Sequence, residues 1–179
     1  MLNKVILVNK KDEEIGTEFK MKAHKEGKLH RAFSVFIFNS TGDLLLQKRS
    51  SKKYHSGGLW TNTCCSHPNP GEITISAAHR RLNEEMGFDC ELSEVFSFVY
   101  MAKLDKEIVE NEFDHVFIGK FNGQPKVNTN EVEDFRWVSL DIIASDIKKY
   151  PGKYTYWFKK CYKKVFNNIG GLANTHGRA

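Results

Sequence analysis

A chain of 179 residues can form one domain with an ordinary core, because a globule of this size buries roughly 70% of the surface that its unfolded chain exposes. Hydrophobic residues make up 40% of the chain and charged residues 27%, as in globular proteins, and no apolar run approaches the ~18 residues of a membrane span. The net charge of +5 comes partly from a cluster of lysines near the C-terminus, and the sequence contains no nucleic-acid-binding motif. Composition and charge therefore favour a protein with no nucleic-acid or membrane partner.

The predicted elements alternate between strands and helices. The first residues lead into a strand-like segment and not into a signal peptide, so we expect a cytoplasmic protein. Apolar and turn residues predict strands at 2–8, 33–38, 44–49, 59–65, 92–101, 108–121 and 135–138. Helical spacing predicts helices at 74–86, 140–148 and 154–168. This order favours an α/β sandwich around a mixed sheet, in one domain over residues 1–171, with residues 172–179 as a disordered tail.

The helix at 74–86 has the clearest pattern. Gly87 follows it as a natural C-terminal residue. Ile75, Ala78, Leu82 and Met86 recur at helical spacing and are predicted to share an apolar face. We therefore expect this face to pack on the sheet.

The charged residues of this helix are in register with residues before it. Their spacing is Ser66-x5-Glu72-x7-Arg80-Arg81-Leu82-x-Glu84-Glu85-x-Gly87. This pattern resembles the Nudix box, in which a loop-helix-loop presents carboxylates to a metal bound to a diphosphate. Ser66 stands where Nudix proteins usually have glycine, and Arg81 where they usually have glutamate. Because metal-assisted attack by water relies on the carboxylate cluster, an arginine there predicts a diphosphate that is held but not cut.

Histidines and glutamates on other segments form a candidate for a second metal site. Glu110 and Glu112 are two residues apart on a predicted strand, so both point to one face. With His24, His30 and His67 they offer three nitrogen and two oxygen donors, which suit six-coordinate Mn²⁺, Fe²⁺, Mg²⁺ or Zn²⁺ better than a tetrahedral structural zinc. The other histidines lack such a setting and are predicted to be structural or exposed: His55, His79, His115 and His176.

Taken in order, these motifs resemble type I isopentenyl-diphosphate isomerase, a divergent Nudix-fold family, over roughly residues 20–160. The resemblance is carried by His24, Leu29-His30-Arg31-Ala32-Phe33-Ser34, Trp60-Thr61-Asn62-Thr63-Cys64-Cys65-Ser66-His67-Pro68, the helix with Arg81 and Glu85, and Ile108-Val109-Glu110-Asn111-Glu112. It implies a Nudix-like α/β/α sandwich and interconversion of isopentenyl and dimethylallyl diphosphate. Moving the double bond takes one protonation and one deprotonation, and therefore an acid and a base on opposite faces of a flat substrate.

The resemblance also implies roles around the double bond. Cys65 would act on one side of the substrate and Glu112, held by the metal, on the other, with Tyr100 bonded to that glutamate. Which side protonates stays open, and we expect Glu112 and Tyr100 to deliver the proton and Cys65 to remove one. Trp157 would cover the cation as an aromatic lid, although a tryptophan on an amphipathic helix can also be a core residue.

For the diphosphate, the resemblance implies binding by Arg49, Lys53, Arg81 and Lys20. Glu85 and the backbone carbonyl of Cys65 would hold Mg²⁺ on the diphosphate. The His/Glu site would take one further divalent metal: Mn²⁺, Mg²⁺ or Zn²⁺.

Two other functions remain open. A Nudix hydrolase of a nucleoside or prenyl diphosphate shares the fold and the Mg²⁺, but it needs a full carboxylate cluster and has no use for Cys65. A catalytically inactive binding module of the same fold would lack Cys65 or Glu112, and both residues are present. The four cysteines have no zinc-ribbon or CxxC spacing, so we expect free thiols, and we expect a monomer or weak dimer.

Overall fold

The computed structural model describes residues 3–104 and 107–175. The strands are β1 (Lys4–Val8), β2 (Glu14–Phe19), β3 (His30–Phe38), β4 (Leu44–Arg49), β5 (Trp60–Thr61), β6 (Cys64–Ser66), β7 (Leu92–Lys103), β8 (Val109–Lys120) and β9 (Val132–Val138). The helices are α1 (Lys20–Glu26), α2 (Thr74–Met86), α3 (Leu140–Lys149), the 3₁₀ helix η1 (Pro151–Lys153) and α4 (Tyr156–Thr175). Helix α4 therefore includes the first residues of the expected tail, and residues 176–179 lie outside the described part of the chain. Within that part, no helix has both the length and the apolar character needed to cross a membrane.

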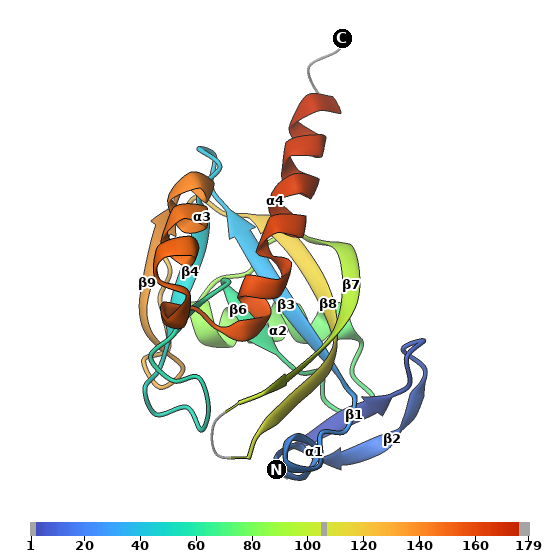
Figure 1. Ribbon diagram of the computed structural model, residues 1–179. Helices are drawn as coiled ribbons and strands as arrows, with labels where there is room; N and C mark the ends of the chain where they lie inside the picture. Colours follow the sequence, from blue (N-terminus) through green and yellow to red (C-terminus); the bar gives the residue numbers. More distant parts are fainter. Residues whose placement is uncertain (1–2, 105–106, 176–179) are drawn as a thin grey trace.

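Strand β3 lies at the centre of a mixed sheet (Figure 1). It pairs antiparallel with β1, β4 and β6, and parallel with β8. Strand β7 pairs antiparallel with β8, while β5 and β9 pair antiparallel with β4. The mixed sheet predicted from the sequence is therefore confirmed.

Helices cover both faces of this sheet because alternate residues of β3 point to opposite sides. On one side Phe36 packs in a cluster with Phe158 of α4 and Ile143 of α3. On the other side Val35 packs in a cluster with Leu82 of α2. In Figure 1, α3 and α4 lie in front of the sheet and α2 lies behind it. This arrangement is the α/β/α sandwich that the sequence predicted.

Helix α2 has the predicted bounds, and Gly87 ends it in the left-handed conformation with φ of 73°. Ala78, Leu82 and Met86 are fully buried, as expected from the apolar spacing. The prediction for Ile75 was wrong, because this residue, in the first turn of the helix, is 36% exposed. The buried face of α2 therefore starts one turn later than the pattern indicated.

The strand predicted at 59–65 is divided into β5 and β6, and the polar residues between them explain why. The Asn62 side chain donates hydrogen bonds to the Val35 and Cys64 carbonyls, at 3.1 and 2.7 Å. The Thr63 hydroxyl donates to the Leu45 carbonyl at 2.6 Å. These side-chain bonds replace strand pairing at residues 62–63. The chain changes partner there, because β5 pairs with β4 whereas β6 pairs with β3.

The sequence pattern predicted no element between residues 15 and 29, where the structure has β2 and α1. Among the described residues, strand β2 pairs only with β1, and its residues are mostly exposed, so it shows no clear apolar pattern. Helix α1 ends at Gly27, which has φ of 62°. The Asn111 side chain donates to the Gly27 carbonyl at 2.8 Å and so joins the end of α1 to β8. This contact places α1 beside the strand that carries the two predicted glutamates.

Candidate active site

Glu112 lies on β8 between two strands that supply its partners. In the register of the sheet, Glu112 is opposite His30 of β3 on one side and Tyr100 of β7 on the other. The Tyr100 hydroxyl donates a hydrogen bond to Glu112 Oε2 at 2.5 Å. Glu112 Oε1 lies 2.8 Å from His67 Nε2 and 3.6 Å from His30 Nε2. The two oxygens of this carboxylate therefore face different groups, a phenol and a pair of imidazoles.

Backbone carbonyls orient two of the predicted histidines. The Nδ1 atom of His24 lies 2.7 Å from the Lys20 carbonyl, and that of His30 lies 2.8 Å from the Lys28 carbonyl. Because only a protonated nitrogen can donate to a carbonyl, each ring in its neutral form keeps the lone pair on Nε2. This fixes the tautomer in which both rings can bind a metal through Nε2.

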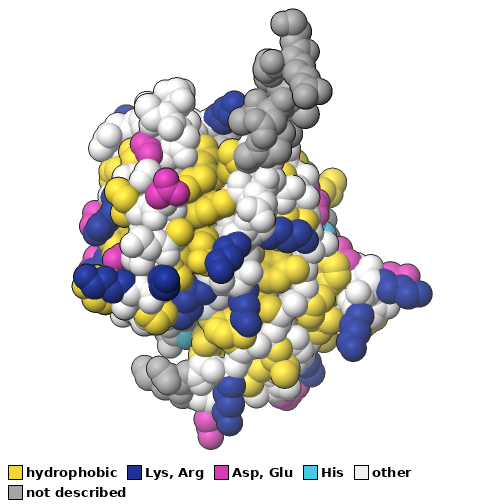
Figure 2. Space-filling view, turned by 45° about the horizontal axis from the view of Figure 1, so that its top comes forward, with side chains coloured by type: hydrophobic (Ala, Val, Ile, Leu, Met, Phe, Trp, Pro, Cys, Tyr) yellow, Lys and Arg dark blue, Asp and Glu magenta, His cyan; other side chains and the backbone are white. Residues whose placement is uncertain are grey.

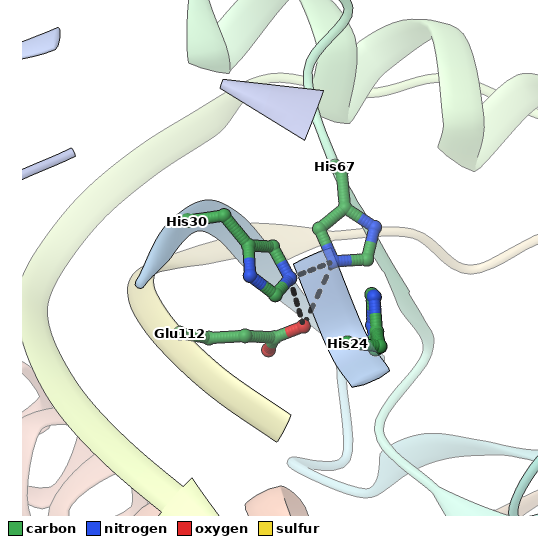
Figure 3. A group of neighbouring side chains, drawn as sticks. All are labelled: His24, His30, His67 and Glu112. Carbon is green, nitrogen blue, oxygen red and sulfur yellow. Dashed lines mark hydrogen bonds and ion pairs between the residues drawn. The ribbon is translucent and has the colours of Figure 1, made fainter. Parts of the chain in front are cut away.

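The resulting group fits a divalent cation. Ligand atoms of His24, His30, His67 and Glu112 all lie within 4.8 Å of one another (Figure 3). The Nε2 atoms of His30 and His67 are only 3.2 Å apart. Glu110, two residues before Glu112, is 1% exposed, and its Oε2 has no hydrogen-bond partner. Nearby imidazole nitrogens and a buried carboxylate oxygen without a hydrogen bond are donors that suit a divalent cation, so the His/Glu cluster is compatible with a divalent metal.

Burial and mutual contacts set the charges of this cluster. Burial opposes ionisation of Glu112, but the His30 and His67 imidazoles hold the pKa of its carboxyl well below the usual range. Burial, helped by the nearby Lys20 ammonium, lowers the pKa of His67 well below its usual value. An ionised carboxylate beside a neutral imidazole is the protonation state in which both can bind a metal.

His55 was predicted to be structural or exposed, and the prediction of exposure was wrong. Its side chain is only 8% exposed, and its Nε2 lies 2.9 Å from Glu110 Oε1. Burial, the largest effect, lowers the pKa of His55, although the Glu110 carboxylate opposes this shift. The loop between β4 and β5 that carries His55 has no periodic pattern, so no sequence signal indicated that this side chain turns inward.

One cavity of about 70 Å³ brings most of the predicted residues together. The predicted residues that line it are Lys20, Arg49, Lys53, Cys65, His67, Arg81, Glu85, Tyr100, Glu110, Glu112 and Trp157. His24 and His30 join it through their contacts with Glu110 and Glu112. Both histidines are fully buried, and on the face in Figure 2 histidine (cyan) reaches the surface only in small spots, while Lys and Arg (dark blue) are spread widely.

The cationic part of the cavity is formed by Arg49, Lys53, Arg81 and Lys20. Arg81 donates to Glu84 at 2.7 Å and to Glu85 at 2.5 Å, which are the residues one turn further along α2. Lys53 pairs with Glu131. All four cations line the cavity, and the buried Nε atoms of Arg49 and Arg81 have no hydrogen-bond partner among the described residues. The arrangement suits an anion with several oxygen atoms.

Cys65 lines the same cavity, next to the cationic part. Its Sγ is 3.7 Å from Arg49 Nη1, whereas the adjacent Cys64 is fully buried on the opposite face of the sheet. Burial raises the pKa of the Cys65 thiol to about 12, although Arg49 opposes this shift. The thiol therefore carries its proton at neutral pH. All four cysteines, each in the described part of the chain, are free thiols, as expected.

Trp157 is a core residue that also lines the cavity. It is 4% exposed and packs in the α4 core cluster. Its ring lies 5.2 Å from the Arg49 guanidinium and 6.1 Å from the His55 ring. A buried aromatic ring in this place can shield the cavity from water.

Comparisons with known proteins agree with this geometry. The family model described as NUDIX domain matches residues 28–158. Isopentenyl-diphosphate Delta-isomerase 2 of Aromatoleum aromaticum is 50% identical, covering 99% of this chain and 96% of that protein. Isopentenyl-diphosphate Delta-isomerase 2 of Photorhabdus laumondii is 54% identical, covering 87% and 88%. In fold, the chain is similar to the MutT protein of Methanosarcina mazei, with a TM-score of 0.65 at 19% identity over 79% of this chain and 95% of that one. The chain therefore belongs to the Nudix family and, within it, to the isopentenyl-diphosphate Delta-isomerases.

Proposed function

We propose that this protein interconverts isopentenyl and dimethylallyl diphosphate in isoprenoid biosynthesis. The observation that carries the proposal is one cavity that holds a thiol, a carboxylate bonded to a phenol, and a group of cations. A proton added to the terminal alkene carbon gives a tertiary cation, and loss of a proton from the neighbouring methylene gives the isomer. No atom is gained or lost in total, so the enzyme has to supply one proton and accept one.

Cys65 and the Glu112–Tyr100 pair are the proposed proton-transfer groups. Cys65 holds its proton at neutral pH because burial raises its pKa, while Glu112 is ionised. For isopentenyl diphosphate these states favour donation by Cys65 and acceptance by Glu112, the opposite of the direction expected from the sequence. In the reverse direction the two groups exchange roles, so one site serves both directions.

The proposed diphosphate site consists of Arg49, Lys53, Arg81 and Lys20, which offer several N–H donors to phosphate oxygens. Glu85 and the Cys65 backbone carbonyl are proposed to hold Mg²⁺ on the diphosphate. Glu85 is 3% exposed, and one of its oxygens already accepts from Gln47 at 3.0 Å, which leaves few directions for a cation. The remaining lining residues, Trp157 among them, would then be left for the apolar end of the substrate.

The His/Glu cluster is proposed to hold one Mn²⁺, Mg²⁺ or Zn²⁺, with His24, His30, His67, Glu110 and Glu112 as its ligands. A divalent cation there would supply positive charge that keeps Glu112 ionised and fixed in direction. Glu112 would meet the substrate through the oxygen that Tyr100 contacts.

The competing hydrolase function is less well supported. Attack by a metal-activated water relies on several carboxylates around the ion. Here Arg81 occupies one of the carboxylate positions of the Nudix box, so the cluster has one carboxylate fewer than a hydrolase uses. The likeness to solved Nudix structures, at 19% identity, concerns the fold alone.

We also infer a cytoplasmic setting and a monomer or weak dimer. The free cysteines support a reducing compartment. Size-exclusion chromatography with light scattering would test the oligomeric state, and a mass of four or more chains would contradict the inference.

The proposed function is tested by proton and phosphorus NMR during incubation with isopentenyl diphosphate, Mg²⁺ and Mn²⁺ in deuterated water. We expect deuterium-labelled dimethylallyl signals with the diphosphate intact. Cys65→Ala and Glu112→Gln should each slow turnover by about 10²–10⁴-fold, the usual contribution of a proton-transfer group. Cys90→Ala is the matched control, since Cys90 does not line the cavity, and it should react like the wild type. Release of inorganic phosphate would show a hydrolase instead, and no change would favour a binding module.

A further inference from the structure

The loop between β4 and β5 has a backbone path that directs His55 inward. Ser56, which follows it, has φ of 51°, a left-handed conformation that is uncommon for residues other than glycine. A Cβ atom on Gly57 would lie 2.9 Å from the Ser51 carbonyl oxygen, so only glycine fits there without a shift. Such a costly path persists only where the surrounding structure holds it. Here it brings the His55 imidazole against Glu110.

The two oxygens of Glu110 are in different situations. Oε1 lies 2.9 Å from His55 Nε2. Oε2 has no hydrogen bond and lies 3.5 Å from His24 Nε2. His24 also belongs to the group formed with His30, His67 and Glu112, so Oε2 is the oxygen on the side of the proposed metal. One oxygen is thus free for the cation, while the other is bound to an imidazole.

The neighbour of His55 is consistent with donation from Nε2. The Ser56 Oγ lies 3.3 Å from His55 Nδ1. A hydroxyl can donate to Nδ1, which leaves the ring proton on Nε2, where it meets Glu110. One neutral tautomer of the His55 ring can therefore make both hydrogen bonds, accepting from Ser56 and donating to Glu110.

We propose that His55 is a positioning residue of the metal site, which holds Glu110 through an Nε2–H donor so that Glu110 Oε2 faces the metal. The proposal rests on the proposed metal site in the His/Glu cluster. Hydrogen bonds to ligating carboxylates fix their direction and typically change metal affinity by about 10–100-fold when they are removed. His55 also contacts Trp157, so it joins the metal site to the aromatic wall of the cavity.

Three substitutions of His55 distinguish the effect of its N–H donor from the effect of its aromatic ring. His55→Gln keeps a donor near the position of Nε2 but removes the ring. His55→Phe keeps the ring and its contact with Trp157 but removes the donor, and His55→Ala removes both. The matched control is His79→Ala, because His79 also contacts a carboxylate, Asp89 Oδ1 at 2.6 Å, but does so at an exposed site outside the cavity.

The measurement is the dissociation constant of Mn²⁺ for the full chain, from calorimetry and from the electron paramagnetic resonance of free and bound Mn²⁺. We expect His55→Ala and His55→Phe to bind Mn²⁺ about 10–100-fold more weakly than the wild type. His55→Gln should recover most of the loss, and His79→Ala should bind as the wild type does. Thermal unfolding of each metal-free variant checks that it is folded.

Each other result overturns the proposal. Wild-type affinity in both His55→Ala and His55→Phe would show that Glu110 needs no partner. Recovery by His55→Phe and not by His55→Gln would show a packing role, and equal loss in all three would show that the imidazole itself binds the metal. His67→Ala tests the metal site separately from the role of His55, because loss of this ligand should abolish Mn²⁺ binding to the His/Glu cluster. If the wild type binds no Mn²⁺, the metal site itself is refuted, whereas wild-type binding with unaffected His55 variants refutes only the role of His55.

Discussion

At the scale of single residues, the charge of Lys20 depends strongly on its surroundings. Burial lowers the pKa of its ammonium group to about 8, and the nearby Arg49 and Lys53 cations add to this effect, against the attraction of Glu110 and Glu112. Lys20 therefore loses its charge within the pH range in which enzymes are commonly assayed. A residue proposed to bind a diphosphate would then bind it less well as the pH rises.

We predict that affinity for inorganic diphosphate falls relative to Lys20→Arg as the pH rises through about 8. Arginine stays protonated throughout this range. The loss of one charged hydrogen-bond donor corresponds to about 1.5–3 kcal/mol, or roughly 10–100-fold in affinity. The ratio of the two dissociation constants, measured by calorimetry from pH 6.5 to 9.5, cancels the titration of the diphosphate itself. A constant ratio would contradict a role for the Lys20 charge.

The thiol of Cys65 offers a second test at this scale. Because burial raises its pKa to about 12, only a small fraction is thiolate at neutral pH in the metal-free protein. We predict that its alkylation by iodoacetamide, followed by peptide mass spectrometry, accelerates with pH up to at least pH 10 without a plateau. In unfolded protein the same cysteine should be half-maximally reactive near pH 8.5 and level off about one pH unit higher. A plateau near pH 8 in folded protein would show a thiolate and return the base role to Cys65.

At the scale of elements, the anchoring of α2 is concentrated in its later turns. Leu82 is fully buried against the sheet, whereas Ile75 is 36% exposed. We predict that Leu82→Ala lowers the free energy of unfolding by about 2–5 kcal/mol, since it leaves a cavity in the core. Ile75→Ala should stay within about 0.5 kcal/mol of the wild type. Urea unfolding with a chelator present measures both, and equal losses would contradict this description of the helix.

The elements that the sequence predicted are those with a strong apolar pattern. Strand β3 is buried along nearly its whole length, and α2 has both an apolar face and a terminal glycine. Strand β2 and helix α1 were missed because the first is an exposed strand and the second has only two buried residues, Ala23 and His24. The division of the strand predicted at 59–65 depends on hydrogen bonds from Asn62 and Thr63 to distant carbonyls, which no local pattern reveals.

The same distinction applies to the site. Glu110, Glu112 and the charged residues of α2 were singled out by their regular spacing, whereas Cys65, Tyr100 and Trp157 were named only through the family resemblance. His55 was missed because its inward direction depends on the left-handed backbone at Ser56 and on the close packing of Gly57. A loop of this kind leaves no periodic signal, since its path is set by tertiary contacts.

At the scale of the whole molecule, the metal cluster joins segments that are far apart in the chain. His24 comes from α1, His30 from β3, His67 from the segment after β6, and Glu110 and Glu112 from β8. Both carboxylates are at most 7% exposed, and burying such charges is costly unless they are paired. A cation that satisfies them would stabilise the folded chain and not only the reaction.

We predict that removing the metal lowers the melting temperature. Binding to the folded state alone stabilises it by about 2.7 kcal/mol when the free metal is 100 times its dissociation constant. For a chain of this size each kcal/mol corresponds to about 2–4 °C, so a chelator should lower Tm by roughly 5–11 °C. Scanning fluorimetry at increasing Mn²⁺ measures the shift, and His67→Ala should abolish it because one ligand is lost. If the wild type and this variant melted at the same temperatures with and without Mn²⁺, the cluster would be a hydrogen-bond network of the apoprotein, and Glu112 would have to act without a cation.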